Sequence, residues 1–180
     1  MNVINIRNSF PFLWKGLRVG LFALLTLTAC DKNDDDSPQD PVSQLPPETT
    51  TGENTFGFVL NGEPFNITNT SNQFAIYQNG FLQFGAAGIT IIIIDPINEN
   101  FNYDLVQTSS NQAKCRFAIE SQDGSLCVYD YEDTILGSLT FTNIDDNNFI
   151  ISGTFEFSTN NEECENIDIT NGRFDLQYIP

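Results

Sequence analysis

The residues that limit the chemistry of this chain are its cysteines, its acidic side chains and the histidines that it lacks. Its 180 residues include four cysteines, 24 acids and seven bases, and no histidine. Without histidine the chain has no Ser-His-Asp arrangement, no imidazole base near neutral pH and none of the commonest metal ligand. A pair of carboxylates can still hydrolyse a glycosidic bond. A small carboxylate-based hydrolase therefore remains possible, whereas most other familiar hydrolytic chemistry does not.

Three acidic clusters are candidates for binding a cation. The first, at a predicted strand end, is Asp130, Glu132 and Asp133. The second, in a predicted turn, is Asp145 and Asp146, and the third, in a predicted loop, is Glu162, Glu163 and Glu165. Calcium takes six to eight oxygen ligands, which loop carboxylates and carbonyls can supply. No cluster has the spacing of a calcium-binding loop, and turn chemistry alone accounts for residues 145–148. We therefore predict no metal site and no cofactor, with calcium binding as an alternative.

The chain begins with the three parts of an export signal. Residues 1–18 carry three bases and no acid, residues 19–27 are apolar, and the small pair Thr28-Ala29 precedes Cys30. The apolar part is shorter than the roughly 20 residues that a membrane-spanning helix needs. Leu27-Thr28-Ala29-Cys30 resembles the lipobox of bacterial lipoproteins. That resemblance implies a signal peptide over residues 1–29, cleavage between Ala29 and Cys30, and lipid on Cys30. The alternative is an uncleaved anchor helix.

The stretch after Cys30 predicts a tether. Residues 30–53 are poor in apolar side chains and rich in Asp, Pro, Ser and Thr, so we expect them to be disordered and extended. The acids directly after Cys30 resemble the lipoprotein export signal of Bacteroidota, which implies the cell surface of the outer membrane, with a periplasm-facing position as the alternative. The lipid bilayer is then a partner through acylated Cys30. Several acyl chains on one cysteine would hold the protein in the membrane permanently, since each buried methylene adds about 0.8 kcal/mol to the membrane affinity.

The charge of the processed chain excludes some partners. All 24 acids but only four bases follow Cys30, so removal of residues 1–29 changes the net charge from −17 to 4 − 24 = −20. Such a chain is repelled by nucleic acid and by anionic lipid head groups. A protein or a glycan remains as an unidentified partner.

Three cysteines remain besides Cys30, and their number is odd. Export implies an oxidising compartment, so we predict one disulfide and one free thiol. In the simplest register of the hairpin over residues 114–131, Cys127 faces Glu120, and a bridge from Cys115 to Cys127 would need a slip. We therefore favour a disulfide between Cys127 and Cys164. The alternative is three buried thiols.

From residue 54 onward the pattern predicts an all-β domain over residues 54–180. Short alternating segments are separated by Asn-Gly, Asp-Gly or Asp-Asn turns, and no helix is predicted after the leader. The apolar run over residues 89–94 is short and β-branched, which predicts a buried strand. The predicted hairpins cover residues 55–67, 73–86, 114–131, 136–158 and 166–178, with turns at 61–62, 79–80, 123–124, 145–148 and 171–172. We expect one antiparallel β-sandwich or barrel.

Two stretches at the ends of the domain resemble a family of uncharacterised Bacteroidota lipoproteins. The first runs from Leu45 through Thr49-Thr50-Thr51-Gly52-Glu53 to Gly57, and the second comprises residues 151–157 and 169–175. Phe58 stands where many relatives have a cysteine, so a disulfide of the family does not carry over. The resemblance implies a small β domain on a lipid tether and no known activity.

Three hypotheses of function follow. The first is a non-catalytic surface lipoprotein with a binding or envelope role. The second is an accessory module that binds glycans or calcium for nutrient capture, with tyrosines as its aromatic contacts, because the only tryptophan, Trp14, lies in the leader. The candidate tyrosines are Tyr77, Tyr103, Tyr129 and Tyr131. The third is the carboxylate hydrolase.

Overall fold

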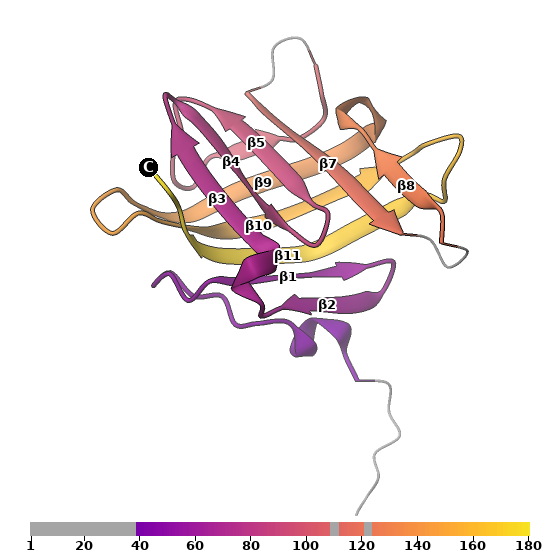
Figure 1. The fold of residues 1–180 in the computed structure, drawn as a ribbon, viewed down its shortest axis with the longest axis horizontal. Coiled ribbons are helices and arrows are strands. Elements are labelled where there is room, and N and C mark those ends of the chain that lie inside the picture. The colour runs from indigo at the N-terminus through magenta and orange to yellow at the C-terminus, as the bar shows by residue number, and fades with distance from the viewer. Residues whose placement is uncertain (1–38, 109–111, 121–123) are drawn as a thin grey trace, which may run out of the picture. The chain divides into compact units, whose positions relative to one another are not determined.

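The computed structural model describes residues 39–108, 112–120 and 124–180 (Figure 1). The predicted signal peptide, the cleavage site at Ala29 and the acylated Cys30 lie outside the described residues, as does the first part of the predicted tether.

The described chain forms a β-sandwich of two antiparallel sheets. One sheet has the order β2-β1-β11-β10-β9-β6 and the other has the order β3-β4-β5-β7-β8, and neither closes on itself. In Figure 1 the second sheet lies in front of the first, with its strands crossing those behind at an angle. The prediction of an all-β sandwich or barrel is confirmed as a sandwich.

The strands are short near the N-terminus and longer toward the C-terminus. Their bounds are β1 Thr55–Leu60, β2 Glu63–Ile67, β3 Gln73–Gln78, β4 Phe81–Ala86, β5 Thr90–Ile94, β6 Asn102–Asp104, β7 Ala113–Glu120, β8 Leu126–Tyr129, β9 Thr134–Asp145, β10 Ile150–Thr159 and β11 Ile167–Gln177. Short 3₁₀ turns form η1 Pro41–Gln44, η2 Thr70–Asn72 and η3 Tyr131–Asp133.

Asn-Gly pairs form two of the predicted hairpin turns. Asn61 and Gly62 connect β1 to β2 with φ angles of 47° and 90°, and Asn79 and Gly80 connect β3 to β4 with 54° and 75°. A type I′ turn needs positive φ at both central positions, which asparagine and glycine tolerate best. These two hairpins are therefore confirmed.

The third Asn-Gly pair does not form the predicted turn. Asn171 and Gly172 lie inside β11, which runs without interruption from Ile167 to Gln177. Asn171 has φ of 52°, and the pairing with β10 is irregular between Phe155 and Phe157. A β-bulge uses the same positive φ as a tight turn, so one dipeptide signals both structures. The predicted closing hairpin is wrong, and β11 instead pairs with β1 and β10.

Aromatic rings from both sheets fill the core. Phe84 of β4 lies 4.6 Å from Phe174 of β11 and 6.1 Å from Phe141 of β9, measured between ring centroids. The predicted buried strand is β5, where Ile91 and Ile93 have no exposed surface. Such tilted and edge-to-face ring pairs stabilise a core beyond their buried area, by about 0.5–1.5 kcal/mol each.

The predicted disordered tether is wrong for its last part. Residues 45–53, named here the strap, pack against the first sheet, and Figure 1 shows them in indigo beside β1 and β2. Leu45 is only 7 % exposed, and Thr49, Thr51, Gly52 and Glu53 all donate hydrogen bonds to Asp175. Disorder was predicted because the segment has few apolar side chains to bury. In the structure, polar contacts hold most of this segment in place.

Candidate functional site

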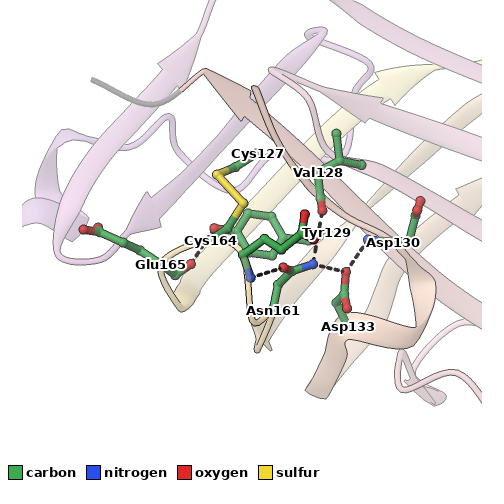
Figure 2. Close-up of a disulfide and its surroundings, with 9 residues drawn as sticks. Cys127, Val128, Tyr129, Asp130, Asp133, Asn161, Cys164 and Glu165 are labelled. Carbon is green, nitrogen blue, oxygen red and sulfur yellow. Dashed lines mark hydrogen bonds between the residues drawn. A yellow bond between two sulfur atoms is a disulfide. The ribbon is translucent and has the colours of Figure 1, made fainter. Parts of the chain in front are cut away.

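The structure contains the disulfide that the sequence analysis favoured. Cys127 of β8 and Cys164 of the loop between β10 and β11 are bonded, with their Cα atoms 5.9 Å apart (Figure 2). The bond therefore connects an edge strand of one sheet to a loop of the other. The expected register was wrong by one residue, because Cys127 lies opposite Ile119 rather than Glu120.

The remaining thiol, Cys115, is buried in the core and unbonded. Burial raises its pKa to about 12, although a hydrogen bond with Thr134 acts in the opposite direction. The thiolate is the reactive form of cysteine, so Cys115 is inert at neutral pH.

Two of the three acidic clusters meet beside the disulfide. Asn161, in the loop that carries Cys164, donates to the Asp133 carboxylate at 2.9 Å, and Tyr129 donates to the carbonyl of Glu165 (Figure 2). Asp133 also accepts from the backbone N–H of Asp130 at 2.8 Å. These contacts order the two loops. In the part of the chain that the structure describes, no group of three or more acidic or cysteine side chains is arranged to hold a metal ion.

Three of the four candidate tyrosines do not gather on one surface. Tyr103 is buried and donates to the carbonyl of Pro96 at 3.2 Å, and Tyr129 is buried beside the disulfide loop. Tyr131 lies under the ammonium of Lys114, 4.2 Å from the ring centroid. Each of these rings contacts its own part of the domain and gives no shared aromatic face.

Tyr77 alone meets a second tyrosine, which the sequence analysis did not name. Its ring lies edge-to-face with Tyr178 at 5.7 Å, and the two hydroxyls donate to Asp95 at 2.6 Å and to Asp146 at 3.1 Å. The bond to Asp95 and then burial raise the pKa of Tyr77 to about 12. Burial and then the bond to Asp146 raise the pKa of Tyr178 to about 12. Both hydroxyls therefore remain protonated donors, and they fasten loops at one end of the sandwich.

A cavity of about 270 Å³ lies between the strap and the outer face of the first sheet. We name it the polar groove. Its lining comes from the strap and from β9, β10 and β11, and consists of Glu48, Ser138, Thr154, Phe155, Glu156, Asn171, Gly172 and Arg173. The register explains why distant residues meet there, because Thr154 pairs with Arg173 and Glu156 pairs with Ser138.

Arg173 is the cationic group of the polar groove. Its Nη1 donates to the carbonyl of Pro46 in the strap at 3.2 Å. Its Nε is buried and has no hydrogen-bond partner among the described residues. A buried donor without a partner costs about 1–3 kcal/mol, so Arg173 is held there at the expense of stability. The groove thus places a guanidinium near two carboxylates and two hydroxyls.

Sequence reasoning assigned no site role to the groove residues. Glu48 lies in the first of the two stretches singled out at the ends of the domain, and Arg173 and Asp175 lie in the second. The structure brings these two stretches into contact through Arg173 with Pro46 and through Asp175 with Thr49.

Within the described ranges, no helix is long and apolar enough to cross a membrane. When compared with known proteins, the chain matches no family model, no curated protein and no solved structure.

Proposed function

We propose that this chain is an exported lipoprotein, acylated at Cys30, that presents a non-catalytic β-sandwich at the surface of the outer membrane. The observation that carries the proposal is the tetrapeptide Leu27-Thr28-Ala29-Cys30, which closes a short apolar run and precedes a run of acids. The disulfide between Cys127 and Cys164 supports it, because disulfides form and persist in exported proteins. The resemblance to Bacteroidota lipoproteins supports the surface position.

The role of the domain in this proposal is binding or envelope structure rather than catalysis. The chain has no histidine, so the general base and the metal ligand that most hydrolases use are missing from its sequence. Its one cysteine outside the disulfide and the proposed lipid site, Cys115, is buried with a raised pKa. Both facts point away from nucleophilic chemistry.

Metabolic labelling with a fatty acid tests the proposal. The full chain is expressed in a Bacteroidota host, and we expect label on the wild type and on Cys115→Ala, the matched control. We expect Cys30→Ala to carry no label and to keep its leader. Label on Cys30→Ala at the wild-type level would overturn the proposal. Protease treatment of intact cells then separates the two faces, since degradation supports the cell surface and full protection refutes it.

The polar groove favours a second candidate function, the binding of a neutral glycan. Sugar hydroxyls both donate and accept hydrogen bonds, and the groove offers the Arg173 guanidinium as donor, Glu48 and Glu156 as acceptors, and the hydroxyls of Ser138 and Thr154. The excess of acids repels anionic ligands, which favours a neutral one.

Calorimetry tests the second candidate with neutral gluco-, xylo- and manno-oligosaccharides as probes. We expect one of them to give saturable heat, which Glu156→Gln reduces at least tenfold in affinity. Glu132→Gln, outside the groove, is the matched control and should bind as the wild type does. If none of these oligosaccharides gives heat, the groove is not a glycan site.

A further inference from the structure

We infer that Asp175 is a clasp that fixes the strap to the outer face of the first sheet and thereby holds Glu48 in the wall of the polar groove. The inference concerns the folded domain and does not rest on the proposed lipid anchor.

The carboxylate of Asp175 accepts hydrogen bonds from the strap and from Ser152 of β10. Its Oδ2 accepts from the hydroxyl of Thr49 at 2.7 Å and from the backbone N–H groups of Thr51 at 3.1 Å and Glu53 at 3.0 Å. Its Oδ1 accepts from the backbone N–H of Gly52 at 2.9 Å and from the hydroxyl of Ser152 at 2.7 Å. Asp175 is only 1 % exposed, so these donors take the place of water.

This arrangement satisfies three consecutive N–H groups of the strap with one side chain. The strap is not part of a sheet ladder, so its N–H groups need acceptors from elsewhere. A carboxylate is the strongest acceptor that a protein offers. Burial acts to raise the pKa of Asp175, but the bonds from Thr49, Glu53, Ser152 and Gly52 together lower it, so the group is charged at neutral pH.

Two close approaches support the same placement of the strap. A Cβ atom on Gly57 of β1 would lie 2.5 Å from Cδ of Pro46, so the strap can pack there only over a glycine. Gly52 has φ of +77°, and a Cβ atom on it would lie 3.0 Å from Gln177 and 3.1 Å from Ile150. Glycine therefore lets the chain approach the sheet at both ends of the strap.

The clasp also holds Glu48 in the wall of the polar groove. Glu48 directly precedes Thr49, whose hydroxyl donates to Asp175, and it lines the groove together with residues of β9, β10 and β11.

Limited proteolysis of the purified full chain tests the clasp. A glutamate-specific protease has sites after Glu48 and Glu53, and the clasp should protect both. We expect Asp175→Asn to raise the rate of cleavage there at least tenfold, because the amide offers one acceptor where the carboxylate offers two and adds N–H groups that face other donors. Asp168→Asn, an exposed position on the same strand, is the matched control and should be cleaved as the wild type is.

Two further measurements keep the test decisive. The buried thiol of Cys115 should stay unreactive toward a maleimide in Asp175→Asn, which shows that the core is folded while the strap is free. Gly57→Ala should raise cleavage in the strap without altering the carboxylate. Wild-type cleavage rates in both variants would overturn the clasp. Lipid labelling at Cys30 should be the same in Asp175→Asn, so failure of the clasp and failure of the lipid anchor are distinguishable.

Discussion

Single polar residues hold the two ends of this domain together. Asp175 near the C-terminus gathers the strap through charge-assisted hydrogen bonds, and Arg173, two residues earlier, donates to Pro46. Along a strand, side chains alternate between the two faces. Phe174 therefore points into the core while Arg173 and Asp175 point to the opposite face, where the strap lies. Neighbouring residues of β11 therefore pack into the core on one face and hold the strap on the other.

The contribution of Asp175 to stability should depend on pH. Its pKa is lowered in the folded state, so its stabilisation is complete above the unfolded value of about 3.9 and is lost as the pH falls through the lower folded value. Hydrogen bonds to a charged group contribute about 1.5–3 kcal/mol. We expect Asp175→Asn to unfold more easily by about this amount at pH 6, and the difference to shrink as the pH falls below about 4.

Urea unfolding of both proteins at several pH values between about 6 and 2.5 measures this difference. Asp168→Asn controls for the loss of a carboxylate from the same strand. A difference between wild type and Asp175→Asn that stays constant over the whole range would mean that shape, and not charge, accounts for the contribution of Asp175.

At the scale of elements, the disulfide is the covalent link between the sheets. Cys127 lies on β8, at the edge of the second sheet, and Cys164 lies on the loop that precedes β11 of the first. The loop and the turn η3 carry most of the acids at this end, which repel one another. The disulfide and the bond from Asn161 to Asp133 keep these like-charged segments together.

Reduction of this disulfide should destabilise the domain. The two cysteines are 37 residues apart, and closing a loop of that size restricts the unfolded chain by about 3–4 kcal/mol in the chain-entropy model. We expect a loss of this size in urea unfolding when a reducing agent is added. The double variant Cys127→Ala, Cys164→Ala should be insensitive to the reducing agent, and Cys115→Ala should respond as the wild type does. An unchanged midpoint for the reduced wild type would contradict the prediction.

The elements show which parts of the structure were predictable from sequence. The Asn-Gly pairs at residues 61–62 and 79–80 separate alternating segments and were predicted as turns, whereas the pair at residues 171–172 has the same local signal and forms a bulge. Pairing of β11 with β1, more than 100 residues away, decides between the two, and local sequence does not contain it. Strand β6 has only three residues, too few to show an alternation.

The candidate sites were predictable to different degrees, because local sequence does not contain the pairing of distant strands. The pairing of Cys127 with Cys164 was favoured because Cys115 and Cys127 do not face each other in the hairpin, which holds although the expected register was wrong by one residue. The polar groove was not predicted, because Glu48, Glu156 and Arg173 meet only through the register of three strands and the placement of the strap. Asp175 could be read as an exposed polar residue of a strand until the strap was seen to cover it.

The whole molecule is dominated by negative charge. The chain carries a net charge of −17, and removal of the proposed leader makes it −20. Charge of this size keeps a protein soluble but destabilises its compact state through self-repulsion. The acids are also spread unevenly, since those of residues 130–133 and 162–165 lie together beside the disulfide.

Salt should therefore stabilise this protein. The Debye length falls from about 30 Å at 0.01 M to about 8 Å at 0.15 M ionic strength, which screens repulsion between surface carboxylates. We expect the thermal midpoint to rise when sodium chloride is raised from about 0.01 M to about 0.15 M, and to change little beyond that. Sucrose of equal osmolality is the control for effects that do not depend on charge. A midpoint that falls with salt would show that attractive ionic contacts outweigh the repulsion.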